Sequence, residues 1–508
     1  MGLKEVIKNM VMKALNIVPA QDNAISITEP LSHNMNVLRN RLWYRGDPSE
    51  LDQFFKQAAT DDVGKSRFWA AVPSADSSIR KLHSGLPGEI VDKLADIVIA
   101  DLDNIELTEQ ELWDEIALDN KLSDEVLADG IKDTLIDGDG AFKLSVDTDV
   151  SEYPLIEFYS GSDVNYTYKR GRLQEVIFPA YYTHEKETYR LEETYGKGTI
   201  SYKLYDKNNE SVPLSKVPEL AELSDIAFTG DFIMAVPMRF FKSAKFKDRG
   251  NSVFERKSDN FDALDEVISQ WIDAIRAGRV KNYIPEDLVP KHPETGYAMR
   301  PNPFDNQFIK IGSSMKEEAK DQIDQIQADI KYTAFVESYA STLDMCLQGI
   351  ISPSTLGIDL KKTDNAEAQR EKEKTTLYTR SKIIDVLTEV IPLLVDTTLK
   401  VHDNMKNKAP GTYEATVSFG EYASPDFGSE VEVVGQAKAF GIMSLEQAIE
   451  ELYGDTWTEE EKALEVKRIR EGDGVVDEPA TNIDGLLDDE EDEEDEEEID
   501  GDEEDGQE

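Results

Sequence analysis

The residue types that most often carry out chemistry in proteins are few in this chain and lie far apart. No two of the five histidines have the spacing of metal ligands. They are His33, His83, His184, His292 and His402. The single cysteine, Cys346, stands among apolar residues, which favours a buried thiol and a reducing compartment, and no disulfide can form within the chain.

Three short segments begin like functional motifs and do not complete them. "HEKET" at 184–188 lacks the second histidine of a zinc-protease helix. "YGKGT" at 195–199 lacks the upstream glycine of a phosphate loop, because Leu191 occupies that place. "DGDGA" at 137–141 has Ala141 where a calcium loop needs an oxygen ligand, so a tight turn is expected. The sequence therefore predicts a protein that is not an enzyme and that holds no cofactor and no metal.

The charge of the chain is strongly negative and unevenly distributed. The chain has 508 residues and a net charge of −49, and 39% of its residues are hydrophobic, enough for a sizeable core. Residues 484–508 hold 18 acidic and no basic side chains, so −31 remains on residues 1–483. An acidic surface repels nucleic acid and argues against tight wrapping of DNA, but it allows DNA to slide past.

Neither a targeting signal nor a membrane span is predicted. Lysines interrupt the apolar residues near the start, which fit a short amphipathic helix better than a signal peptide. No uninterrupted apolar run is long enough to cross a bilayer.

The first half of the chain changes from helical to strand-like patterns. Apolar spacing predicts helices over 48–57, 89–101 and 107–135. From about 141 to 240 the pattern is β-rich, and "KRGR" at 169–172 has the composition of a hairpin turn.

A basic segment then leads into an amphipathic helix. Residues 239–257 contain seven basic and two acidic residues. In the helix that follows, the apolar stripe is opposed by a narrow acidic stripe, Asp262, Asp265, Glu266, Ser269 and Asp273. An ordinary solvated face and a face that lines a channel both fit this pattern.

The second half is mainly helical and contains one conspicuous loop. Residues 281–312 are rich in Pro, Asn and Gly, and a helix is expected at about 315–349, although its apolar stripe changes face near Thr333. The loop "SPSTLGIDLKK" (352–362) precedes a helix whose first part, 365–376, has no large apolar residue, and Pro392 is expected to kink that helix. A strand at 413–420, helices at about 428–440, 443–453 and 458–471, and a disordered acidic tail follow.

The order of these segments resembles the portal, or head-to-tail connector, proteins of tailed bacteriophages. The resemblance covers about residues 35–475 and is carried by diffuse motifs. "NRLWYRGDPSELDQFFKQ" (40–57) looks like the entry to a portal wing, and 249–279 is similar to the segment that leads into the first stem helix. "GIISPSTLGIDLKKTDNAEAQREK" (349–372) looks like the tunnel loop and the helix after it, and 417–426 and 441–452 resemble the approach to the crown.

The resemblance implies an α+β, mainly α, portal fold that forms a homo-oligomeric ring, usually of twelve subunits. It places an N-terminal arm at 1–45, the wing at 46–250, stem helices at 251–280 and 319–350 and the clip at 281–318. It places the tunnel loop at 351–364, a long kinked helix and wing strand at 365–427, crown helices at 428–475 and the tail at 476–508.

The implied function is a channel at one capsid vertex through which double-stranded DNA passes during packaging and ejection. Implied partners are terminase, head-completion or adaptor proteins, and the major capsid and scaffold proteins. The implied location is the virion, with assembly in the host bacterial cytoplasm. No membrane is involved, and ATP hydrolysis belongs to the terminase.

Three sets of residues receive roles in this hypothesis. The tunnel loop would face DNA through Ser352, Thr355, Lys361 and Lys362. The channel would be lined by Asp262, Asp265, Glu266 and Asp273, whose charges would repel phosphate. Neighbouring subunits would meet at Glu367, Arg370, Lys372 and Lys374.

Two other interpretations remain. A non-enzymatic acidic assembly factor, such as a scaffold-like or DNA-mimic protein, would need neither the loop nor the helix pair around the clip. A calcium-buffering protein is suggested by the acidic tail alone, without a loop of ligand spacing.

Overall fold

The computed structural model describes the chain in two compact units, Met1–Tyr422 and Ala423–Glu508. The described residues are 29–59, 62–72, 79–278, 281–285, 292–293, 295–296, 308–311, 324–326, 330–358, 366–420, 427–453, 457 and 459–472. The helix expected before residue 20, Lys361, Lys362 and the acidic tail lie outside them.

The first unit begins with helices that have clear start signals. They are α2 (His33–Arg45), α3 (Pro48–Ala58), α4 (Asp62–Lys65) and α5 (Leu86–Ala100). Ser32 caps α2 by accepting a hydrogen bond from the Met35 N–H, and Asp47 caps α3, in which Pro48 occupies the first turn. The helices expected at 48–57 and 89–101 are thus confirmed.

The helix expected over 107–135 is interrupted. The structure has strand β1 (Leu102–Leu107), helix α6 (Gln110–Asp119), a π-helical turn (Leu122–Leu127) and helix α7 (Ala128–Asp137). Lys121 adopts a positive φ of 48° between α6 and the π turn, so the backbone changes direction there. The apolar periodicity did not reveal the break, because residues on both sides of it are buried in one core.

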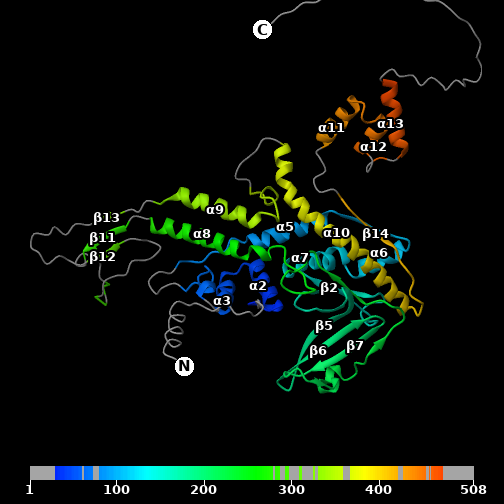
Figure 1. Cartoon of the computed structure of the whole chain (residues 1–508), viewed down its shortest axis with the longest axis horizontal. Coiled ribbons are helices and arrows are strands. Elements are labelled where there is room, and N and C mark those ends of the chain that lie inside the picture. The colour runs from blue at the N-terminus through cyan, green and yellow to red at the C-terminus, as the bar shows by residue number, and fades with distance from the viewer. Residues whose placement is uncertain are drawn as a thin grey trace, which may run out of the picture. The chain divides into compact units, whose positions relative to one another are not determined.

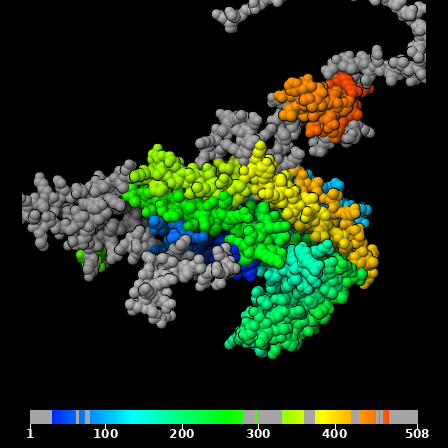
Figure 2. Space-filling model, viewed as in Figure 1, coloured from blue at the N-terminus to red at the C-terminus, as the bar shows by residue number. Residues whose placement is uncertain are grey.

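The region expected to be β-rich contains strands, which form two sheets. Strands β10 (Ala235–Met238), β2 (Gly140–Ser145) and β3 (Leu155–Ser160) form an antiparallel sheet in that order. The larger sheet has the order β4-β5-β6-β7-β8, with β9 (Ile226–Ala227) beside β7. Its strands are β4 (Asn165–Lys169), β5 (Arg172–His184), β6 (Glu187–Gly196), β7 (Thr199–Tyr205) and β8 (Ser211–Val212). Figure 2 shows this region as a lobe that projects from the helical part of the unit.

Two turns of the large sheet contain the segments "KRGR" and "HEKET". Arg170 and Gly171 both have positive φ between β4 and β5, so "KRGR" forms the expected hairpin. The "HEKET" segment forms the turn between β5 and β6, where Glu185 and Lys186 have positive φ.

Two 3₁₀ turns, Leu214–Lys216 and Pro218–Leu220, lie between β8 and β9. After β10, a 3₁₀ turn (Glu255–Lys257) leads to α8 (Ser258–Ala277), which lies side by side with α9 (Tyr332–Leu347) (Figure 1). Between them β11 (Lys281–Pro285) pairs in parallel with β12 (Phe308–Ile311) and antiparallel with β13 (Asp324–Ile326). The helix expected at 315–349 therefore starts at Tyr332. Ile326 lies on β13 and Ile330 precedes α9, which explains the change of face in the apolar pattern.

The unit closes with a long helix and a strand that returns to its beginning. A 3₁₀ turn (Ser354–Leu356) precedes α10 (Ala366–Met405). This helix has 40 residues and continues through Pro392. Strand β14 (Ala415–Phe419) then pairs antiparallel with β1. The main core lies where these helices meet β2, and it contains Trp43, Leu94, Phe142, Phe261 and Leu387.

The second unit contains three helices at the expected places. They are α11 (Phe427–Ala439), α12 (Leu445–Tyr453) and α13 (Glu459–Gly472). Ala448 and Ile449 of α12 are buried within the unit, and the Tyr453 and Trp457 rings stack with centroids 4.1 Å apart. The fold class is α+β, as expected from the sequence.

Candidate functional site: the junction of α8, α9, the 348–358 loop and α10

The acidic stripe of α8 does not form a continuous solvent-exposed face. Asp262 and Asp265 are buried, with 8% and 0% of their surface exposed. Asp262 accepts hydrogen bonds from the backbone N–H groups of Phe68 (2.9 Å) and Trp69 (3.1 Å). Burial raises the pKa of Asp262, and the two N–H donors oppose this increase. The prediction that these two residues line a channel is therefore wrong.

Asp265 is the centre of a buried polar network. One carboxylate oxygen accepts from Trp69 Nε1 (3.1 Å) and His83 Nδ1 (2.6 Å), and the other accepts from the Ser84 N–H (2.8 Å). One turn further on, Ser269 Oγ accepts from the Leu82 N–H at 2.9 Å. These contacts fasten α8, as far as Ser269, to residues 68–69 and 82–84. The period of 3.6 that places acids on one face cannot show whether that face meets water or protein.

The second half of α8 is held mainly by α9. Trp271 stacks on Phe335, with ring centroids 6.3 Å apart and planes at 3°. Lys257 Nζ and Asn260 Nδ2, at the start of α8, donate to the Met345 carbonyl in the last turn of α9. Glu266 and Asp273, the other two channel candidates, are half-buried, and Glu266 accepts a hydrogen bond from Gln270 at 2.8 Å. Their channel role remains a prediction.

The loop after α9 is anchored by threonines of α10. The Ser352 N–H donates to Thr376 Oγ1 (2.9 Å), and the hydroxyls of Thr355 and Thr376 lie 2.8 Å apart. Thr379 Oγ1 donates to the Ile350 carbonyl at 2.6 Å. Ser352 is 1% exposed, so the expectation that its side chain faces DNA is wrong, because that side chain turns inward to Ser354 Oγ.

The remaining predicted residues are only partly described. Thr355 is half-buried at the anchored end of the loop, whereas Lys361 and Lys362 lie outside the described residues. The backbone of Glu367, Arg370 and Lys372 belongs to α10, and their side chains lie outside the described part. Lys374 is exposed.

The side chains that connect α10 to the rest of the unit were not predicted from the sequence. Arg380 Nε donates to Asp101 Oδ2 at 2.6 Å, and Arg380 also donates to the Gly420 carbonyl. Thr376 and Thr379, three residues apart, lie on one face of α10, and this spacing is the only signal of them in the sequence. Nothing in the sequence pairs Arg380 with Asp101, because 279 residues separate them.

The two acids of the "DGDG" segment contact arginines. Asp137 accepts two hydrogen bonds from Arg41, both 2.9 Å long, and Asp139 lies 3.2 Å from Arg249. Between them Gly138 has φ 102°, and a Cβ there would approach the backbone of Asn251 to 2.6 Å. The expected tight turn is thus confirmed.

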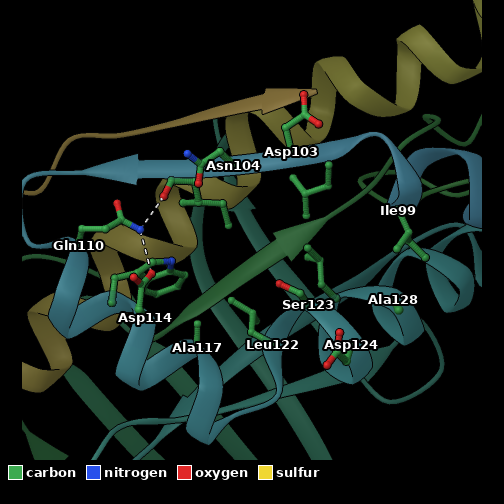
Figure 3. A pocket seen from close by; sticks show the side chains of 14 residues that line it. Ile99, Asp103, Asn104, Gln110, Asp114, Ala117, Leu122, Ser123, Asp124 and Ala128 are labelled. Carbon is green, nitrogen blue, oxygen red and sulfur yellow. Dashed lines mark hydrogen bonds between the residues drawn. The ribbon is translucent and has the colours of Figure 1, made fainter. Parts of the chain in front are cut away.

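A hollow of about 330 Å³ lies beside β1, α6 and the π turn (Figure 3). Gln110 reaches the free edge of β1, where it accepts from the Leu107 N–H (3.1 Å) and donates to the Ile105 carbonyl (3.1 Å). Gln110 also donates to Asp114, as the dashed lines in Figure 3 show. The side chain thus blocks pairing of β1 with a further strand.

The described residues show neither a metal cluster nor an activated cysteine. Among them no group of three or more His, Cys, Asp or Glu residues could hold a metal ion. Cys346 is fully buried, and burial raises the pKa of its thiol to about 12. No helix in the described part of the chain is long and apolar enough to span a bilayer.

Comparison with known proteins finds similarity at the level of structure. No protein-family model matches the chain, and no curated protein matches it. A chain of a solved structure titled "Neck of native GTA particle computed with C12 symmetry" is similar with a TM-score of 0.39 and 11% identity. The similarity covers 75% of this chain and 89% of that chain. These values are too low to assign the chain to a family.

Proposed function

We propose that this chain is the subunit of a viral portal ring, a channel at one capsid vertex for the packaging and ejection of double-stranded DNA. The observation that carries the proposal is the order of elements around the α8–α9 pair. A small sheet (β11–β13) joins the two helices, and the anchored loop and the 40-residue α10 follow. This is the order of stem helix, clip, stem helix, tunnel loop and long helix that the sequence resemblance implies.

Exposed apolar side chains on α9 and α10 support self-association. Tyr332, Val336 and Met345 of α9 are 67%, 44% and 54% exposed, and Tyr378 of α10 is 67% exposed. Large apolar groups on neighbouring elements are typical of surfaces that another chain covers. A ring of copies would remove them from water.

In this proposal β11–β13 and their flanking residues form the clip, where terminase docks during packaging and head-completion proteins bind afterwards. Residues 351–364 form the tunnel loop, and α11–α13 form the crown. The subunit joins the major capsid and scaffold proteins in the host cytoplasm and remains in the virion. It hydrolyses nothing itself.

Electron microscopy of purified protein tests the proposal directly. Negative-stain images should show closed rings with an axial channel, and native mass spectrometry should give one integral copy number, with twelve expected. Chains that stay monomeric at high concentration and in the presence of the cognate scaffold protein would contradict the proposal.

A pair of charge substitutions separates specific from general effects of surface change. Tyr378→Glu should reduce ring formation at least tenfold, because it places a charge in the apolar contact. Leu118→Glu is the matched control, since Leu118 is 80% exposed on α6, away from the junction, and rings should form as in the wild type.

A further inference from the structure

A second hollow at the junction is lined by basic residues and lacks acidic ones. It has a volume of about 430 Å³ and lies between residues 241–257, the end of α9 and α10. Lys242, Arg256, Lys257 and Lys382 line it, and no Asp or Glu is among its described lining residues. We call this cavity, with its four cations, the basic hollow. In a chain with 104 acidic and 55 basic residues, such a site is unusual.

Most of these charges are not neutralised within the described chain. Lys257 donates to the Met345 carbonyl at 2.7 Å, whereas Lys242, Arg256 and Lys382 form no ion pair with any described residue. Other cations of the same basic segment are paired. Lys245 lies 3.5 Å from Glu255, and Arg249 lies 3.2 Å from Asp139.

The walls of the hollow are fixed by internal hydrogen bonds. Thr379 donates to the Ile350 carbonyl (2.6 Å), Ser252 Oγ donates to the Leu135 carbonyl (2.9 Å), and Asn251 Nδ2 donates to the Ser252 carbonyl (2.8 Å). These polar groups are therefore already bonded, and the cations remain to recognise a ligand. Gathered cations repel one another, and an anion placed among them relieves that repulsion.

We propose that the basic hollow receives carboxylates from a second copy of this chain. The inference rests on the proposed ring, in which copies must touch although each carries a net charge of −49. Contact between two such chains is opposed unless cations lie at the interface. Aspartate and glutamate side chains fit a hollow of about 430 Å³, and arginine and lysine form charge-assisted hydrogen bonds with them. A rigid DNA duplex fits less well, because the acidic body repels its many phosphates.

Zero-length cross-linking between isotopically distinct copies tests the contact. Rings are assembled from an equal mixture of ¹⁴N- and ¹⁵N-labelled chains and treated with a carbodiimide, which joins a lysine amine to a carboxylate in contact. Peptides that contain Lys242 or Lys382 should be linked to acidic peptides of the other isotope. If these lysines give only links within one copy, while other lysines give links between copies, the proposal is overturned.

Charge reversal provides the second arm. Arg256→Glu/Lys382→Glu should weaken association at least tenfold, measured by mass photometry over a concentration series. Lys121→Glu/Lys207→Glu is the matched control, because both lysines are exposed and pair with nearby acids (Glu125 and Glu187), and it should change association less than twofold. Circular dichroism and the melting temperature establish that both variants are folded.

The outcomes separate this inference from the proposed function. Intact rings of the Arg256→Glu/Lys382→Glu variant would show that the basic hollow is not a subunit contact. The proposal of a ring would be unaffected. Wild-type chains that never associate would overturn both. Unchanged association together with lost binding of a duplex oligonucleotide would overturn the inference in favour of DNA.

Discussion

Asp265 shows how a single carboxylate can connect a helix to the body of the protein. Its side chain has no exposed surface, and it accepts hydrogen bonds from Trp69, His83 and Ser84. A carboxylate can only accept, so His83 donates through Nδ1. Removal of the acceptor leaves three buried donors unsatisfied, which costs more than the loss of one exposed ion pair.

Asp265→Ala should therefore lower the free energy of unfolding by about 3 kcal/mol. Urea denaturation followed by tryptophan fluorescence measures the change, since Trp69 belongs to the network. Asp273→Ala, on the half-buried part of the same helix, is the control and should cost about 0.5 kcal/mol or less. Equal effects of the two substitutions would contradict the network.

His33 gives the protein a dependence on pH. Burial, together with the charge of Arg249, lowers the pKa of His33 from 6.5 to about 4. Arg249 Nε donates to His33 Nε2 at 3.0 Å, and this contact requires the neutral ring. Because the folded pKa is the lower one, this contribution to stability is present above pH 6.5 and is lost as the pH falls toward 4.

Between pH 6.5 and 4, His33 should add a slope of less than about 1.4 kcal/mol per pH unit, because the ring is only half-buried. His33→Gln should flatten the dependence, as measured by thermal unfolding over this range. His184→Gln, at the end of β5, is the matched histidine substitution. A steeper slope in His33→Gln would refute the assignment.

At the scale of elements, α8 and the loop after α9 are held by contacts of different kinds. Buried carboxylates fasten the first half of α8, while the second half depends on stacking against α9. The loop is bound to α10 at Ser352 and Thr355, before it reaches the two lysines. Thr376 thus holds the described start of the loop against α10.

Thr376→Val should release this anchor at a cost of about 1–2 kcal/mol, because the Ser352 N–H becomes a buried donor without an acceptor. Hydrogen exchange followed by mass spectrometry should then show about tenfold faster exchange in peptides that cover 350–358. Thr388→Val is the control, since Thr388 is exposed and bonds only the Ile384 carbonyl of its own helix. Unchanged exchange in Thr376→Val would show that Thr376 does not hold residues 350–358 in place.

At the scale of the whole molecule, the acidic charge of the chain acts both on DNA and on assembly. It keeps duplex DNA from adhering, and it also opposes contact between copies. In the proposed ring, cations at defined points offset the repulsion between copies. In the proposed ring, the basic hollow serves subunit contact, while Lys361 and Lys362 serve DNA.

Lys361→Ala/Lys362→Ala should therefore leave ring assembly intact and weaken binding of duplex DNA. The dependence of log affinity on log salt should become shallower by roughly two contacts per engaged subunit. Fluorescence anisotropy with a labelled duplex, repeated at several salt concentrations, measures this slope. Loss of rings in the variant would show instead that the loop is a subunit contact.

The sequence by itself determined the local helices, strands and turns. Hydrophobic period and turn chemistry located the hairpin at Arg170 and Gly171, α3, α8 and the helices of the second unit. These features depend on neighbouring residues, so a linear pattern contains them. Ala141 after the "DGDG" segment likewise favoured a tight turn over a calcium loop, and the structure has that turn at Gly138, with both acids beside arginines.

Only the tertiary structure decided which groups meet. Asp262 and Asp265 lie on a polar stripe of α8, but residues 68–69 and 83–84 pack on them, so two charges predicted to face a channel are buried. The pairing of Arg380 with Asp101 and the four cations of the basic hollow likewise join segments that are distant in the chain. Helical periodicity gives the direction of a side chain relative to its helix, and long-range packing alone determines what lies in that direction.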